Sequence, residues 1–186
     1  LGNRLDHLVN IETVSMDDTT RQLLRLPIEN LKIDTTQDLR KTLGEYEYAL
    51  NPQEFWDLHY ANTLYNSPAI FVYNSPQGKA SLANHMAPVA LPNEPTLKPL
   101  VDEITQDAIT KEQKIQSLLD FVTNEVAYES HGKFEIFMKP HETLLSGRSD
   151  CSGKVVLFAS LLEQIEEPYL LVYTPGHISV GVQGDF

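Results

Sequence analysis

The chain is poor in cysteine, in basic residues and in long apolar runs, and each shortage excludes a class of protein. Its single cysteine, Cys151, rules out an internal disulfide framework and a zinc site built from thiolates. Lys and Arg number 14 against 26 Asp and Glu, and the resulting formal charge of −12 disfavours nucleic acid as a partner. No apolar stretch approaches the ~20 residues of a membrane-spanning helix, so none is predicted in this chain.

The start of the chain shows neither an initiator Met nor the charged-then-apolar pattern of a signal peptide. We therefore expect a processed product or a piece of a longer protein, whose other parts could include a membrane anchor. The content of 41% hydrophobic and 22% charged residues is that of an ordinary globular domain. We divide the chain into an N-terminal extension of unknown type, residues 1–96, and a core, residues 97–186.

The first 95 residues have an irregular pattern. Helices are predicted at residues 15–26 and 51–66, the second with Asn51 as its cap and Pro52 in its first turn. A strand followed by a turn is predicted within residues 69–80. Residues 86–99 contain four prolines and are typical of an extended connector.

After the connector the periodicity becomes regular. Helices are predicted over residues 98–110 and 111–128, a short helical turn over 142–145, and a longer helix from Cys151 that ends before Pro168. Two β-rich runs, 169–175 and 177–183, flank Pro175-Gly176 and predict neighbouring strands. This order predicts an α+β fold in which the Cys-bearing helix packs on an antiparallel sheet.

Cys151 stands where a helix begins, which is a position suited to a nucleophile. A thiol reacts as the thiolate, and the free amides and dipole of a helix N-terminus stabilise that charge. Asp150 or Ser149 is the natural cap, although Asp150 could also support the nucleophile directly. His177 follows after one helix and one strand, which is a route that can return an imidazole to the head of the helix. The alternative is that Cys151 is a small buried core residue.

At these residues the sequence resembles a known family. The stretch "KPHETLLSGRSDCSGKVVLFASLLEQIEEPYLLVYTPGH", residues 139–177, is similar to the transglutaminase-like superfamily, a branch of the papain-like cysteine peptidase fold, as found in bacterial transglutaminase-like domains. The resemblance covers about residues 97–186. It implies a papain-like core in which Cys151 and His177 are the first two members of a catalytic triad. It also places Glu166 where the family usually has glycine.

The third member of the triad is missing from the pattern. The family's acid usually lies on the strand after the histidine strand, and the only later acid here is Asp185. Eight residues of strand at ~3.3 Å each would carry Asp185 too far from His177. We therefore expect that the core is incomplete at its C-terminal end or that the domain has no such acid.

Two functions follow from these residues and the resemblance. The first is a cysteine enzyme that hydrolyses or transfers peptide or amide acyl groups through the thiolate, without a cofactor, on a protein or peptide substrate. The second is a catalytically inactive binding or assembly module of a larger envelope protein, and a periplasmic or extracytoplasmic location suits both. No metal site is predicted, because the spacings of His131, His141 and His177 fit no ligand pattern. His141 is expected to face solvent or to cap a helix.

Overall fold

The computed structural model describes residues 36–60, 72–74, 81–83, 85–86, 88–130, 138–174 and 177–184. The predicted helix at residues 15–26 lies outside these ranges. The fold is mixed α+β, as predicted. Within the described ranges no helix is both long and apolar enough to cross a membrane. The elements are β1 (Leu39–Leu43), β2 (Tyr46–Leu50), α3 (Pro52–Tyr60), β3 (Val72–Asn74), β4 (Ser81–Ala83), α4 (Lys98–Ile104), α5 (Lys111–Asn124), β5 (Ala127–Tyr128), α6 (Pro140–Ser146), β6 (Arg148–Ser149), α7 (Cys151–Gln164), β7 (Tyr169–Thr174) and β8 (His177–Val182).

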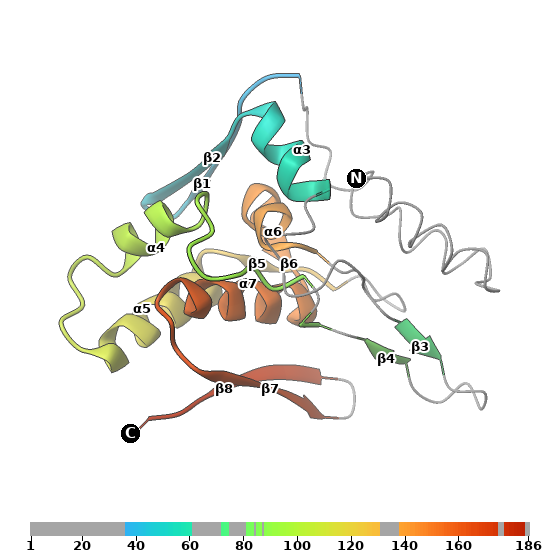
Figure 1. Cartoon of the computed structure of the whole chain (residues 1–186), viewed down its shortest axis with the longest axis vertical. Helices are drawn as coiled ribbons and strands as arrows, with labels where there is room; N and C mark the ends of the chain where they lie inside the picture. The colour runs from blue at the N-terminus through green and yellow to red at the C-terminus, as the bar shows by residue number, and fades with distance from the viewer. Residues whose placement is uncertain are drawn as a thin grey trace.

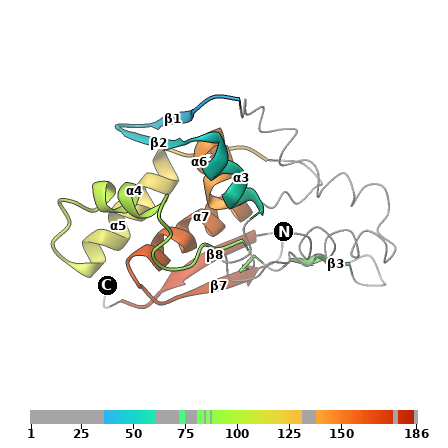
Figure 2. The same cartoon turned by 45° about the horizontal axis from the view of Figure 1, so that its top comes forward.

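Helix α7 lies in the middle of the molecule. Figures 1 and 2 show the β7–β8 hairpin on one side of it, with α6 and then the β1–β2 hairpin on the other. Residues 155–162 are all buried, which is the pattern of a helix that is covered on every side. The main core joins apolar side chains from residues 39–58 with others from residues 97–162, so the described N-terminal part packs onto the same core as α7.

The β1–β2 hairpin is a feature that the sequence analysis missed. Gly44 has a φ of +62°, and the tight turn that it allows pairs Leu43 with Tyr46 in an antiparallel ladder. Buried Tyr48 and Leu50 alternate with exposed residues along β2, as expected for a strand with one face on the core. The prediction of irregular chain before residue 95 is therefore wrong for residues 39–50.

Helix α3 begins where the sequence predicts. The Asn51 side chain accepts a hydrogen bond from the Glu54 amide at 2.9 Å, and the Glu54 carboxylate accepts one from the Asn51 amide at 2.8 Å. This reciprocal pair satisfies two amides that have no partner inside the helix. The described part of α3 ends at Tyr60, and the rest of the predicted range, residues 61–66, lies outside the described residues.

Helices α4 and α5 are shorter than predicted. Helix α4 ends at Ile104, where the buried Thr105 hydroxyl bonds back to the Val101 carbonyl at 2.8 Å. Helix α5 begins with a capping box between Thr110 and Gln113 and ends at Asn124. The last residues of its predicted range form β5, which pairs in parallel with β6.

The proline-rich connector lies against α7. The Ser160 hydroxyl accepts a hydrogen bond from the Ala90 amide at 3.0 Å. The Gln164 side chain accepts one from the Glu94 amide at 2.8 Å and donates one to the Leu91 carbonyl at 3.0 Å. Buried polar side chains of the helix thus satisfy backbone groups of a segment that has almost no regular structure of its own.

Helix α7 ends in a Schellman motif that has glutamate in the position usually taken by glycine. The Glu167 amide bonds to the Leu162 carbonyl at 3.0 Å, and the Glu166 amide bonds to the Glu163 carbonyl at 3.2 Å. Glu166 has a φ of +56°, in the left-handed region that favours glycine. The chain then turns into β7.

Helix α7 begins at a tightly packed turn. The Asp150 side chain caps it by accepting a hydrogen bond from the Gly153 amide at 3.0 Å, as predicted. A Cβ at Gly153 would lie 1.9 Å from the Ser149 Oγ and 2.9 Å from the Ser149 Cβ. Gly153 therefore permits the close approach of β6 to the first turn of α7.

We expect Glu166→Gly to stabilise the protein by ~0.5 to 1 kcal/mol. Relief of the left-handed strain outweighs the added freedom of the unfolded chain. Chemical denaturation with an unchanged dependence on denaturant would measure the gain. The matched control is Asn93→Gly, because Asn93 also has a positive φ, 60°, but asparagine tolerates that conformation. Equal effects of the two substitutions would contradict the assignment of strain to Glu166.

We expect Gly153→Ala to destabilise the protein by about 2 kcal/mol, because Ser149 is fully buried and must shift to admit the methyl group. This is the reverse of the gain that alanine normally brings inside a helix. Gly181→Ala is the control, since its added Cβ would meet only the Val172 side chain at 3.6 Å, an ordinary contact. If the two variants have the same thermal unfolding midpoint, the contact between Ser149 and Gly153 is not tight enough to exclude a methyl group.

Candidate functional site

Cys151 and His177 line the same cavity. The cavity has a volume of about 290 Å³ and lies between α5, β5, α7 and β8. Its walls are mainly apolar side chains, and it is open to solvent on the side where Tyr128 and His177 are exposed. The lining residues are Leu119, Val122, Thr123, Tyr128, Cys151, Lys154, Val155, Phe158, His177, Ile178, Ser179 and Val180.

Cys151 is the first residue of α7 and is partly exposed. Its thiol therefore stands at the N-terminal end of a 14-residue helix, where free amides and the helix dipole stabilise negative charge. Asp150 is buried, caps the helix and does not line the cavity, so it acts on the helix rather than on a bound group. Cys151 is therefore not a fully buried core cysteine, which was the alternative interpretation of its position.

His177 is the first residue of β8, paired in register with Thr174 of β7, and its side chain is exposed. Alternation along the strand gives His177 and Ser179 one face of the hairpin and gives buried Ile178 the other. Among the residues that the structure describes, no hydrogen bond joins the imidazole to Cys151, and no side chain orients the ring. The two groups share a cavity without being in contact.

The cavity follows the open edge of β8. Four consecutive residues, 177–180, line it, which means that it runs beside the strand rather than across one of its faces. In the described part of the chain β8 pairs only with β7. The other edge of β8 therefore has backbone donors and acceptors available beside Cys151.

Two lining residues with ionisable side chains, Lys154 and Tyr128, were not identified from the sequence. Lys154 lies one helical turn after Cys151, a spacing that could have placed it on the same face. Burial lowers the pKa of its ammonium group, which donates to the Thr123 carbonyl at 3.3 Å. Tyr128 is largely exposed and reaches the cavity because β5 pairs with β6 immediately before α7, a pairing that has no local sequence signal.

A hydrogen-bonded chain that runs from buried Ser152 and His85 to half-exposed Tyr173 lies behind the cysteine. His85 Nε2 is 3.0 Å from the Ser152 Oγ, and His85 Nδ1 is 3.2 Å from the Tyr173 hydroxyl. Because Ser152 is buried, its hydroxyl is not a second nucleophile at this site. The chain instead ties the first turn of α7 to β7, and so fixes the helix relative to the hairpin that carries His177.

Of the other sequence candidates, only His141 lies among the described residues, and it does not line this cavity. Asp185 and His131 lie outside the described residues. His141 is 1% exposed on α6, so the prediction that it faces solvent is wrong. Its burial is a consequence of α3 packing against α6, which the local sequence does not reveal.

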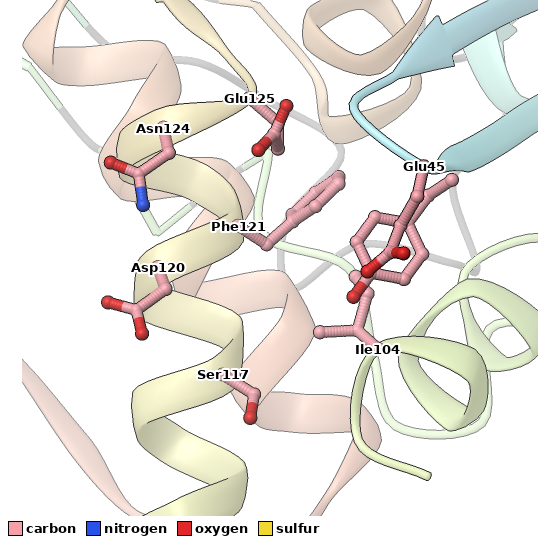
Figure 3. A pocket seen from close by; sticks show the side chains of 8 residues that line it. Glu45, Ile104, Ser117, Asp120, Phe121, Asn124 and Glu125 are labelled. Atoms are coloured by element: carbon pink, nitrogen blue, oxygen red, sulfur yellow. The ribbon is translucent and has the colours of Figure 1, made fainter. Parts of the chain in front are cut away.

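A second cavity, of about 320 Å³, lies between the β1–β2 turn, α4 and α5 (Figure 3). It carries three carboxylates, those of Glu45, Asp120 and Glu125. Figure 3 shows Asp120 on one side of α5 and Glu45 across from the other side, beyond Phe121. The carboxylates do not converge on a point, so the hollow resembles a solvated acidic surface more than an ion site.

No protein-family model matches the chain, and comparisons with curated proteins and with solved structures also give no match. The residues and geometry of the cavity that holds Cys151 and His177 are therefore the basis for assigning a function.

Proposed function

We propose that this chain carries a transglutaminase-like cysteine centre that hydrolyses or transfers peptide or amide acyl groups. One observation carries the proposal. The only cysteine of the chain is the partly exposed first residue of a capped helix, and it opens into the same cavity as a histidine that begins a neighbouring strand. Nucleophilic cysteine enzymes need this combination of a helix N-terminus, an imidazole and a sheltered space.

The reaction would use the two side chains in turn. The Cys151 thiol gives its proton to the His177 imidazole, and the sulfur attacks the carbonyl carbon of the substrate. The backbone amide of Cys151 is the natural donor to the developing oxyanion. The C–N bond then breaks as histidinium gives the proton to the leaving amine, which leaves a thioester. Water releases the acid in hydrolysis, and a second amine releases a new amide in transfer.

The surrounding topology supports the same proposal. Helix α7 packs on the antiparallel β7–β8 pair, and the order of Cys helix, strand and His strand is the order of the papain-like family that the sequence resembles. The lack of a hydrogen bond between Cys151 and His177 does not argue against a free enzyme, because catalytic hydrogen bonds are often long before substrate binds. The exposed position of His177 leaves its side chain free to turn toward the thiol.

A non-catalytic binding or assembly module, as in an envelope protein, is the second candidate. The observation that favours it is the absence, within the described ranges, of any side chain that orients the His177 ring. An imidazole without such a partner can adopt the wrong tautomer, which in a Ser-His-Asp enzyme reduced turnover by ~10⁴-fold. The apolar cavity beside an open strand edge would serve a module equally well as a binding surface.

We expect a peptide carrying an electrophilic group, such as a vinyl sulfone, to label the native protein at Cys151 and to label the unfolded protein far more slowly. Intact-mass and peptide-mass spectrometry would locate the adduct. Removal of the imidazole in His177→Ala should slow labelling by a factor on the order of 10² or more. Cys151→Ser should abolish it with no change in thermal unfolding.

His59→Gln is the matched histidine control, because His59 pairs with Glu142 of α6 and does not line the cavity. It should retain most of the labelling in any preparation that folds. If His177→Ala labels as fast as the unmodified chain, the imidazole does not assist the thiol. The binding-module proposal then stands in place of the enzyme.

A further inference from the structure

Three metal-binding side chains meet on the side of the molecule away from the cavity that holds Cys151. They are His59 at the end of α3 and His141 and Glu142 in the first turn of α6. One ligand atom from each lies within 4.8 Å of the other two. None of the three lines that cavity. We propose that this cluster is a binding site for a zinc-class transition-metal ion that joins α3 to α6.

The distances suit a tetrahedral ion. The His59 Nδ1 is 2.8 Å from the Glu142 Oε1, and the His141 Nε2 is 4.0 Å from the same oxygen. Ligand atoms around a four-coordinate zinc at ~2.0 to 2.1 Å are about 3.3 to 3.5 Å apart. The two observed values bracket this separation, and the ligand atoms of His59 and His141 lie within 4.8 Å of each other, so small side-chain movements would bring all three atoms to a metal. Two imidazoles and one carboxylate form a donor set that zinc commonly takes, with a fourth position left for water.

The rings are already held in place. The His59 ring stacks on Phe55, with centroids 5.8 Å apart and planes 12° apart, and the His141 ring meets the edge of Phe55 at 5.4 Å. Phe55 itself is 1% exposed. Ligands fixed by packing lose little side-chain freedom on binding, which favours affinity for a metal.

The Glu142 carboxylate is oriented by its neighbours. One oxygen lies 2.8 Å from the His59 Nδ1. Its second oxygen accepts a hydrogen bond from the Lys139 amide at 2.8 Å, which orients the group as outer contacts orient metal ligands.

The charge of Lys139 opposes a cation at this place, and two features limit the effect. Its ammonium group already donates to the carbonyls of Leu58 and His59, so it is committed to the end of α3. Glu94 lines the same small hollow as His141 and is buried, which adds a second negative charge to the region. The region around a divalent ion and Lys139 would therefore contain two buried carboxylates, those of Glu142 and Glu94, which partly balance the positive charge.

The sequence could not suggest this site because its members are far apart in the chain. His59 and Glu142 are separated by 83 residues, and His141 and Glu142 are adjacent, a spacing found in no standard ligand motif. The expectation of no metal came from comparing His131, His141 and His177. His59 stands in a helix beside Phe55 and Trp56, a setting that indicates aromatic packing rather than metal binding.

The test begins with the unmodified chain, freed of metal by a chelator and titrated with Zn²⁺. We expect one equivalent to remain after dialysis, by elemental analysis, and the unfolding midpoint to rise by roughly 5 to 10 °C at a hundredfold excess over Kd. Co²⁺ should give the visible bands of a four-coordinate site without the thiolate charge-transfer band that ligation by Cys151 would produce. No retained metal and no shift in the midpoint would show an ion pair only and overturn the proposal.

The decisive variant is His59→Gln, which keeps a side-chain donor for Glu142 but removes a metal ligand. We expect its Zn²⁺ affinity to fall on the order of 100-fold or more while the metal-free protein unfolds close to the unmodified midpoint. His85→Gln, at another buried histidine, should bind Zn²⁺ normally, and so should Cys151→Ser. If binding is lost with Cys151→Ser and not with His59→Gln, the ion belongs to the thiol and the proposal is wrong. Should His59→Gln fail to fold, the Co²⁺ spectrum of the unmodified chain decides between these ligands.

Discussion

The burial of α7 is the constraint on which the rest of the structure depends. Eight consecutive residues, 155–162, are removed from water, because α4, α5, α6 and the β7–β8 hairpin cover the helix on different sides. A helix that is covered along its length can meet solvent only near its ends. Its N-terminal end, with Cys151, is where the free amides and a partly exposed side chain coincide. The position that suits a nucleophile thus follows from packing, together with the cap supplied by Asp150.

Local signals predicted the elements around Cys151 well. The cap at Asp150, the breaks near Pro168 and Pro175 and the β-rich run after Tyr169 are each visible within a few residues, and the structure has the helix and both strands there. The β1–β2 hairpin was missed because Lys41 interrupts the apolar alternation of its first strand, which leaves the buried Leu39 and Leu43 four residues apart. Its pairing depends on one turn at Gly44 and on contact with a core that is distant in the sequence.

The same difference between local signals and distant contacts applies to the cavity of Cys151 and His177 and to the cluster of His59, His141 and Glu142. Cys151 and His177 were identified because one helix and one strand lie between them, so their meeting is nearly a local property. Tyr128 and His59 were not identified, because each reaches its site through contact between two segments that no local sequence pattern predicts. These contacts are β5 with β6 and α3 with α6. Spacing rules detect ligands carried by one element, whereas these side chains are brought together only by the assembled core.

The junction between α3 and α6 also has a consequence for how the chain folds. Contacts among α5, α7 and the β7–β8 hairpin join segments that follow one another closely, so their formation closes only short loops. The bond between His59 and Glu142 spans 83 residues, and closing a loop of that length costs about 4 kcal/mol of chain entropy. We therefore expect the C-terminal half to form the folding nucleus. The β1–β2 hairpin and α3 would then dock onto it. By the same reasoning, that N-terminal layer would be the first to exchange its amide hydrogens from the native state.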